Sequence, residues 1–351
     1  MNASQPENLP APGLASSRFG PWPRPPAPPH LLLLLPGGGG PDRRAALSVV
    51  TLVVVALALV RAAVATLPGD FLPPIRAIRQ SSSGESTQTA CAELADGNAT
   101  CWGYSGYGTT GRPCNSVINS VCAPDEVLSL GTGRTVKQLD LGGAHGCAVL
   151  DNAKLKCWGD NLYFQLARDN ATELRIGDDV DEMGDALPVV KRSGVALDVV
   201  QVATGYKHTC ALLADETVSC WGWNAYGTLG VGLAENQPLA VMNPSAPVQL
   251  GAGFVPASIV AGYSTYVVST SGGVKAWGPN DYGQLGIGDT ADRGDGDPNN
   301  PSYNDMGDNL PAIEFPAGVE AIVSLSPGQD HGERGRGWTT GPFGGLAFGL
   351  L

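Results

Sequence analysis

The sequence predicts an all-β protein built from repeated units of about four short strands each. The main observation is a phrase that recurs four times, a Trp-Gly dipeptide with a Tyr five residues after the Trp. Its tryptophans are Trp102, Trp158, Trp221 and Trp277, so the spacings are 56, 63 and 56 residues. A period of this size indicates one supersecondary unit that packs against copies of itself. Short Val-, Leu- and Ile-rich runs separated by turn residues favour strands, and no sustained helical period interrupts them.

Within each unit, the runs of apolar residues predict a hairpin that ends at the Trp-Gly strand. In the third unit, the run 199–213 is followed by a polar turn and then by 217–222. Equivalent turns at 96–98, 151–153 and 271–273 contain Asp, Asn or Gly, which tolerate positive φ. The chain also has 48 glycines, which suit tight turns between strands. Such four-stranded units, stacked around an axis, form a β-propeller.

The loop after the Trp-Gly strand carries the clearest motif. Residues 224–230 read Asn-Ala-Tyr-Gly-Thr-Leu-Gly, and residues 280–286 read Asn-Asp-Tyr-Gly-Gln-Leu-Gly. With the Gly-x-x-His-x-Cys-Ala and Cys-Trp-Gly motifs upstream, these loops resemble the regulator of chromosome condensation repeat. The resemblance is greatest to its cysteine-bearing form in secreted and membrane proteins of bacteria and protists. The first two units are looser, with Ser105 in place of Asn and with Phe164 and Ala167 in place of Gly.

The resemblance covers residues 75–331 and implies a propeller fold. It implies no single function, because this fold serves nucleotide exchange, ligase scaffolding, enzyme inhibition and light sensing. A fifth unit begins at 323–331 and does not continue, and the Gly-rich residues 332–351 are expected to form an irregular tail. Family propellers close with about seven blades, which removes open sheet edges. The propeller is therefore expected to be incomplete: a truncated product is favoured, and an open arc capped by a partner is the alternative.

The cysteines fall into local pairs. There are eight of them: Cys91, Cys101, Cys114, Cys122, Cys147, Cys157, Cys210 and Cys220. Three pairs have a spacing of 10 residues and bracket one expected hairpin each, which places their thiols on neighbouring strands. The fourth unit has Tyr266 and Ala276 at these positions, and Cys114 and Cys122 form a further local pair. This pattern predicts disulfides and an oxidising compartment. The alternative is eight buried thiols in a cytosolic propeller; no C-x-x-C spacing supports a zinc site.

An apolar segment precedes the repeats. Residues 45–60 carry no charge, Arg43 and Arg44 stand before them, and the apolar stretch reaches Thr66 if Arg61 is included. The segment 45–66 is interpreted as a signal anchor, with the Pro- and Gly-rich residues 1–44 disordered on the cytosolic side. The alternatives are a signal peptide cleaved after Ala63-Val64-Ala65 and a buried core helix. Both an anchor and a signal peptide would deliver the repeats to a lumen or to the exterior.

Two further features concern the loops. Asn98 and Asn170 begin Asn-Ala-Thr sequons, which predict glycosylation of an exported chain. The acidic loops 178–188 and 305–311 share the sequence Met-Gly-Asp-x-Leu-Pro and are interpreted first as solvated insertions between blades. Calcium is a second interpretation, because Ca²⁺ prefers oxygen ligands. The calcium candidates are Asp289, Asp292, Asp295 and Asp297.

The sequence offers no catalytic constellation and no cofactor motif. His145, His208 and His331 occupy one position of the repeat, so they are expected to hold the blades together, as are the Trp and Tyr of each unit. No Ser-His-Asp order, metal-ligand spacing or phosphate loop can be assembled. The net charge of −12, from 21 basic and 33 acidic residues, argues against nucleic-acid binding, which requires a basic surface.

Together these features predict an extracytoplasmic, membrane-anchored repeat scaffold that binds a protein partner through its loops and has no catalytic activity. The alternative is a guanine-nucleotide exchange factor or regulatory propeller acting on a small GTPase in the cytosol or nucleus. The apolar segment and the paired cysteines oppose that alternative. A propeller-borne enzyme would need a constellation outside these units.

Overall fold

The computed structural model describes the repeat region and a few residues that follow it. The described residues are 73–81, 88–114, 121–168, 173–232, 244, 246–296, 304–316, 322, 325–327 and 346–348. The expected disordered N-terminus, the apolar segment 45–66, Asn170, Asp297 and His331 lie outside them. Within the described part, no helix is long and apolar enough to cross a membrane.

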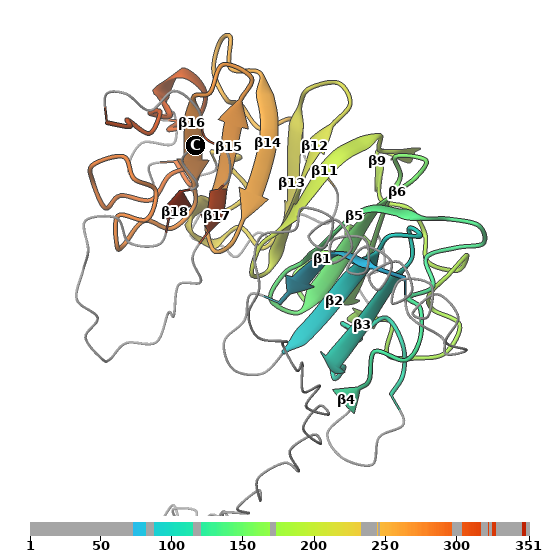
Figure 1. The fold of residues 1–351 in the computed structure, drawn as a ribbon. Coiled ribbons are helices and arrows are strands. Elements are labelled where there is room, and N and C mark those ends of the chain that lie inside the picture. Colours follow the sequence, from blue (N-terminus) through green and yellow to red (C-terminus); the bar gives the residue numbers. More distant parts are fainter. Residues whose placement is uncertain are drawn as a thin grey trace, which may run out of the picture. The chain divides into compact units, whose positions relative to one another are not determined.

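The described part is all-β, as predicted, and each of the four units forms one antiparallel sheet (Figure 1). We call these sheets blades 1 to 4. Blade 1 is formed by β1 (Ile75–Gln80), β2 (Thr89–Leu94), β3 (Ala99–Tyr104) and β4 (Val121–Cys122). Blade 2 is formed by β5 (Val136–Leu141), β6 (His145–Leu150), β7 (Leu155–Asp160) and β8 (Arg175–Ile176). Blade 3 is formed by β11 (Val199–Thr204), β12 (His208–Leu213) and β13 (Val218–Gly222), and blade 4 by β14 (Pro256–Ala261), β15 (Thr265–Ser269) and β16 (Val274–Trp277).

The remaining elements are short. They are the hairpin strands β9 (Lys191–Arg192) and β10 (Val195–Ala196), the 3₁₀ turns η1 (Ala225–Gly227) and η2 (Gly307–Asn309), and the paired strands β17 (Leu325–Pro327) and β18 (Leu346–Phe348). β17 lies in the expected start of a fifth unit and contacts β14. Its partner β18 comes from the segment that the sequence predicted to be irregular.

The four blades share one register and follow one another in chain order. In each blade the first strand has an irregularity at its second residue, where it pairs with the second strand. The first strands of consecutive blades contact each other, β1 with β5, β5 with β11 and β11 with β14 (Figure 1). This arrangement of first strands is that of propeller blades around an axis.

In blades 2 to 4, the tryptophan of the Trp-Gly strand is bonded to the preceding blade. Trp158, Trp221 and Trp277 are fully buried. Each indole N–H donates to a backbone carbonyl in the loop of the preceding blade, seven residues after that blade's own Trp. These bonds run from Trp158 to Thr109 O at 3.0 Å, from Trp221 to Gln165 O at 2.9 Å and from Trp277 to Thr228 O at 3.1 Å. The expectation that the tryptophans are packing residues therefore holds for these three.

The repeated histidine reaches the same carbonyl through a threonine. His145 Nε2 lies 2.8 Å from Thr209 Oγ1, and Thr209 Oγ1 donates to Gln165 O at 2.8 Å. Because the hydroxyl proton is used on the carbonyl, the histidine must donate its Nε2 proton. His208 repeats the arrangement with Thr265 in the next blade, at 3.0 Å. Both histidines are only 1% exposed, which confirms their expected structural role and removes them from solvent.

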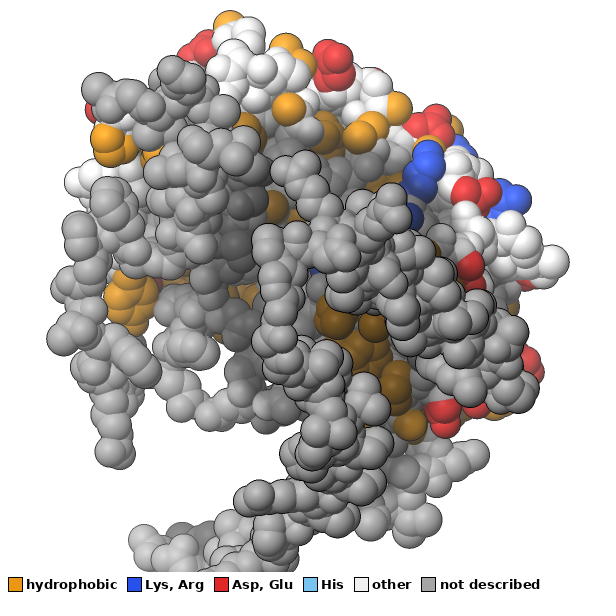
Figure 2. Space-filling view, in the orientation of Figure 1, with side chains coloured by type: hydrophobic (Ala, Val, Ile, Leu, Met, Phe, Trp, Pro, Cys, Tyr) orange, Lys and Arg blue, Asp and Glu red, His pale blue; other side chains and the backbone are white. Residues whose placement is uncertain are grey.

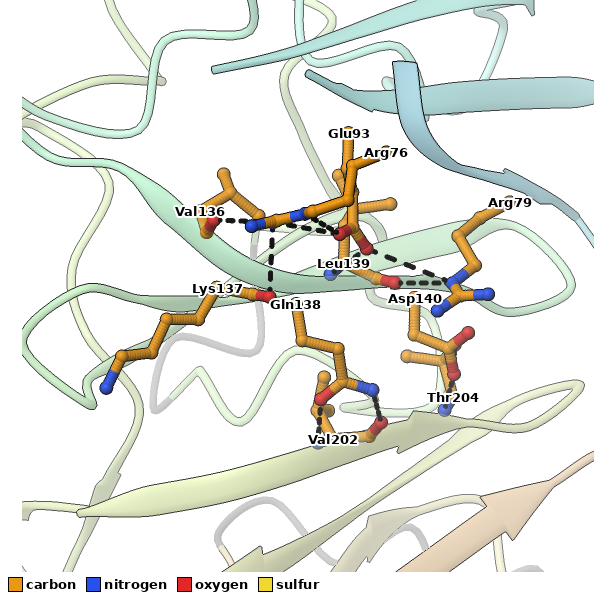
Figure 3. Close-up of polar contacts among 10 residues, drawn as sticks. All are labelled: Arg76, Arg79, Glu93, Val136, Lys137, Gln138, Leu139, Asp140, Val202 and Thr204. Atoms are coloured by element: carbon orange, nitrogen blue, oxygen red, sulfur yellow. Dashed lines mark hydrogen bonds and ion pairs between the residues drawn. The ribbon is translucent and has the colours of Figure 1, made fainter. Parts of the chain in front are cut away.

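A third contact joins the first strands of neighbouring blades (Figure 3). The Gln138 side chain donates to Val202 O and accepts from Val202 N, both at 2.9 Å, so one amide pairs with the N–H and the C=O of one residue. Gln201 holds Ile259 in the same way, at 2.9 and 3.0 Å. These amides satisfy inner-strand backbone groups that would otherwise lack partners.

Between blades 1 and 2 an ion pair replaces the glutamine. Glu93 accepts from Leu139 N at 2.9 Å, and Arg79 donates to Leu139 O at 3.1 Å (Figure 3). Arg76 holds the other oxygen of Glu93 at 3.0 Å, so the buried carboxylate is paired. The two charged residues thus make the contacts that one glutamine makes between the later blades.

The cysteines form the four expected bonds. The pairs Cys91–Cys101, Cys147–Cys157 and Cys210–Cys220 each join directly opposite residues of a hairpin, with Cα atoms 4.1 Å apart. Cys114–Cys122 lies within blade 1 and links the segment after β3 to β4. In blade 4, Tyr266 and Ala276 face each other in the same register, and the Tyr266 hydroxyl donates to Gln284 O at 2.9 Å.

Removing the bond of blade 3 should destabilise the chain. Closing a loop of this length restricts the unfolded chain by about 3 kcal/mol, so Cys210→Ala combined with Cys220→Ala should lower the free energy of unfolding by roughly that amount. Urea unfolding of the two proteins measures the difference. An equal midpoint for the double variant and the parent, both without reductant, would show that this bond does not hold the blade.

The buried histidines should make the fold sensitive to mild acid. Burial lowers the pKa of His208 to about 4, and burial with the nearby His208 lowers the pKa of His145 to about 3. The unfolded chain titrates near 6.5, so it binds more protons below that pH and stability falls as the pH drops from about 6.5 to about 4. His208→Gln keeps a donor for Thr265 but cannot titrate, and should reduce this loss by an amount on the order of 2 kcal/mol.

The control is a carboxyl group whose protonation changes the stability in the opposite direction as the pH falls. Burial, aided by the Asp305 and Asp292 charges, raises the pKa of Asp295 to about 6, so its protonation favours the folded state as the pH falls. Asp295→Asn should therefore steepen the acid loss that His208→Gln flattens. Urea midpoints at neutral pH and near pH 4.5 test both, and parallel pH curves for His208→Gln and the parent would contradict the assignment.

Candidate functional site

The loop after each Trp-Gly strand is built to turn its tyrosine outward. The loop asparagine accepts a hydrogen bond from the leucine N–H five residues later, from Leu166 to Asn161, Leu229 to Asn224 and Leu285 to Asn280, at 2.9 to 3.2 Å. The three leucines are buried, which fixes the loop from below. In blade 1, Ser105 replaces the asparagine and bonds the Thr110 hydroxyl at 2.5 Å instead.

The tyrosines of these loops are not core residues, contrary to the expectation from the repeat. Tyr226 is 54% exposed and Tyr282 is 68% exposed, while Tyr107 and Tyr163 are half-buried. The residue after the tyrosine has a positive φ in each loop, including Phe164 at 63°, where the motif has Gly. The main chain therefore reverses directly beneath the ring, and this turn directs the tyrosine toward solvent rather than into the blade.

At the loop end of blades 2 to 4, aromatic side chains lie side by side around one lysine. We call this group the aromatic end; it consists of Tyr163, Tyr206, Lys207, Trp223, Tyr226 and Tyr263. The loops after β7 and β13 and the turns β11–β12 and β14–β15 meet at this end of the antiparallel sheets. Tyr206 stacks on Tyr263 of the next blade with ring centroids 4.6 Å apart. Trp223 lies 6.0 Å from Tyr163 and 6.1 Å from Tyr226.

Lys207 occupies the middle of the aromatic end. Its ammonium lies 4.5 Å from the Tyr163 ring centroid, 5.0 Å from that of Tyr206 and 5.4 Å from that of Trp223. It also donates to the Tyr163 hydroxyl at 3.4 Å. Cations over aromatic faces are attracted by the ring quadrupole. No carboxylate of the described residues lies within ion-pair distance of this ammonium.

The nearest acid to this end is held by other groups. Asp160 accepts from Gln165 Nε2 at 2.7 Å. Burial raises the pKa of Asp160, and the Gln165 hydrogen bond and the charges of Arg175 and Lys207 act in the opposite direction. Arg175 itself lies over the Tyr107 ring at 4.9 Å, so a second cation rests on the loop tyrosine of blade 1.

The acidic loops have structural partners instead of forming a site. In the first loop, Lys156 donates to Gly184 O at 2.7 Å, and the Asp185 carboxylate accepts a hydrogen bond from Thr132 N at 2.9 Å. In the other loop, Lys275 donates to Gly307 O at 2.9 Å and Asp308 accepts from Ala252 N at 2.7 Å. The shared Met-Gly-Asp sequence therefore marks a shared way of closing a blade. On the face shown in Figure 2, acidic side chains are scattered and form no single patch.

The calcium candidates do not converge in the described part. Asp289 pairs with Arg293 at 2.6 Å, and Asp292 accepts from Asn280 N at 2.7 Å. Burial and neighbouring acids raise the pKa of Asp295, as above, but among the described residues no three metal-type side chains could hold an ion together. Asp297 lies outside the described residues.

The sequence pointed to few of the residues that form the aromatic end. Tyr163 and Tyr226 belong to the repeat, which predicts packing residues at their position. Lys207 and Trp223 each occur in one blade only, whereas Tyr206 and Tyr263 stand at the same position of blades 3 and 4, after the first strand. The sequence signal for the two tyrosines is the Gly-Tyr dipeptide at 205–206 and 262–263. The glycosylation candidate Asn98 lies in the β2–β3 turn, where its amide donates to Asp96 at 2.9 Å.

Comparison with known proteins agrees with the repeat assignment. Residues 136–165 and 199–228 match the model of the regulator of chromosome condensation (RCC1) repeat. The chain is 28% identical over 220 residues to the ultraviolet-B receptor UVR8 of Arabidopsis thaliana, covering 62% of this chain and 44% of that protein. It is 39% identical over 98 residues to the probable E3 ubiquitin-protein ligase HERC4 of Homo sapiens, covering 28% of this chain and 9% of that protein. The chain thus spans less than half the length of these relatives.

A solved structure agrees on the fold. The crystal structure of human WBSCR16 superposes with a TM-score of 0.52 at 20% sequence identity, covering 74% of this chain and 59% of that one. At that identity the likeness concerns the fold alone. The matched repeats and the shared register of the four blades show that the chain contains repeats of the regulator of chromosome condensation type.

Proposed function

We propose that the chain is an extracytoplasmic repeat scaffold that binds a protein partner through the aromatic end of blades 2 to 4. The observation that carries the proposal is the gathering of tyrosine, tryptophan and lysine at the ends of loops that the blades hold rigidly. Tyr and Trp are enriched at protein interfaces, where they supply contact area at low cost in conformational entropy. Their bodies are apolar and their tips polar, which suits a surface that alternates between water and a partner.

The location rests on the disulfides. Four bonded pairs persist in oxidising compartments and are rare in the cytosol. Export would need a targeting segment, and residues 45–66 are proposed to supply it as a signal anchor. The same bonds weigh against the alternative of an exchange factor acting on a small GTPase in the cytosol or nucleus.

The proposal includes no catalytic step. The two described histidines are buried and neutral and each donates to a threonine, so neither can exchange a proton with a substrate. Four described acids have raised pKa values: Asp140 accepts from Thr204, Asp160 from Gln165 and Asp292 from Asn280 N, and Asp295 lies near Asp305 and Asp292. The aromatic end offers cations and rings, which are groups for recognition.

Site-specific photo-cross-linking in intact cells tests both parts of the proposal. A photoreactive amino acid at position 226 should yield an adduct with a partner, and the same group at Glu216, in the β12–β13 turn at the opposite end, should not. In sealed vesicles prepared from those cells, the adduct should resist protease until detergent is added. Trp223→Ala should reduce the yield at position 226 at least tenfold, because aromatic anchors contribute about 1.4 kcal/mol or more to such interfaces.

Two outcomes would contradict the proposal. Equal adducts at positions 226 and 216 would show that the aromatic end is not the binding surface. An adduct that protease removes without detergent would place the repeats in the cytosol and favour the regulator of a small GTPase.

A further inference from the structure

Lys207 forms no ion pair among the described residues, and Asp160, the carboxylate on which its charge acts, is hydrogen-bonded by Gln165. Three rings and one hydroxyl surround the Lys207 ammonium, at the distances given above, and the side chain is half-buried. The other partly buried described lysines are satisfied differently: Lys154 pairs with Asp198 at 2.7 Å, and Lys156 and Lys275 donate to backbone carbonyls. Lys207 therefore has ammonium protons to spare on the solvent side of its aromatic surround.

The surroundings of this ammonium favour an anion. The three aromatic rings near the ammonium lower the local dielectric constant, so an ion pair formed on its open side is screened by less water and is stronger. The ammonium alone does not choose between a carboxylate and another anion. The ring surfaces of Tyr206, Tyr263 and Trp223 beside it offer apolar contact, which a peptide flanking a carboxylate can use and a free anion cannot.

The second cation at this end is in a similar position. Arg175 lies over the Tyr107 ring one blade earlier, and no described carboxylate forms an ion pair with it either. Acids do lie nearby: Asp160, opposite Arg175 in the pairing of β7 with β8, is hydrogen-bonded by a loop glutamine, and Asp178 lies against Gly108. Both cations therefore keep N–H groups with which a carboxylate of a partner can pair.

We propose that the aromatic end recognises an acidic peptide segment, in which an Asp or Glu carboxylate pairs with Lys207 and neighbouring apolar atoms cover Tyr206 and Trp223. The pair would form inside a rim of aromatic contact that excludes water, the arrangement in which a charged pair contributes most to binding. This inference rests on the proposed function and names the chemistry of the partner.

Selection of phage-displayed random linear peptides on the full chain tests the inference. The enriched peptides should carry Asp or Glu next to an aromatic residue or proline. Their affinity should fall roughly tenfold or more on Lys207→Met, which keeps the apolar stem and removes the charge. Lys154→Met is the matched control, a lysine at the opposite end of blade 2, and should bind the same peptides like the parent. Lys207→Gln is measured in the same assay as Lys207→Met, and an equal loss of affinity in both shows that the loss comes from the missing charge and not from the methionine.

The outcomes separate the two claims. Peptides that need Trp223 but bind Lys207→Met and the parent equally, or enriched peptides that are neutral or basic, overturn the acidic-partner inference and leave the aromatic end as a binding surface. Peptides that need neither residue, or a selection that enriches none, count against both. Equal thermal midpoints of Lys207→Met and the parent establish that any loss of binding is not a loss of fold.

Discussion

The packing of consecutive blades depends on one backbone carbonyl per loop. In blades 2 and 3 this oxygen accepts two bonds from the next blade, one from the Trp indole and one from a threonine hydroxyl that a histidine in turn holds. A carbonyl oxygen has two lone pairs, so both bonds can be satisfied at once. A fully buried tryptophan with an unpaired N–H would be costly, and this contact removes that cost while setting the distance between sheets.

The same constraint explains where function can lie. Because Trp, His, Asn and Leu of the repeat are all used beneath the loops, the positions left for recognition are those that the loops present to solvent. The tyrosine five residues after each Trp is one such position, and the residues that differ between blades, such as Lys207 and Trp223, are the others. Repeat proteins of this kind keep the scaffold constant and vary the surface.

Much of the fold could be read from the chain, and the reasons are local. The hairpins follow from apolar runs and turn residues, and the 10-residue Cys spacing put each pair opposite one another on a hairpin. The sequence did not show that the glutamines join neighbouring blades, because Gln138 and Gln201 bond backbone groups 58 to 64 residues away along the chain. The sequence also did not show that Arg79 and Glu93 replace the glutamine between blades 1 and 2, because the residue types change while the bonds to the backbone of the next blade are kept.

The candidate site was harder still. Its residues come from four loops, Lys207 and Trp223 have no counterpart in the other blades, and the repeat itself suggested that its tyrosines were buried. Blade 4 shows how far a unit can depart from the pattern: Tyr266 takes the cysteine position, and its hydroxyl donates to Gln284 O, the carbonyl that matches the acceptors in earlier loops. The side-chain nitrogen of Gln284 has no partner among the described residues, because Pro279 stands where blade 2 has Asp160.

The central claim is that side-chain bonds to backbone groups make neighbouring blades one cooperative unit. Native-state hydrogen exchange of Gln201→Leu tests it most directly, since this variant removes both bonds to Ile259 and leaves every strand pairing within a blade intact. The account predicts that protection falls in blades 3 and 4 together, with Ile259 N–H and the β11–β12 amides losing the same free energy of opening. Faster exchange at Ile259 alone, with unchanged protection elsewhere in both blades, would contradict it.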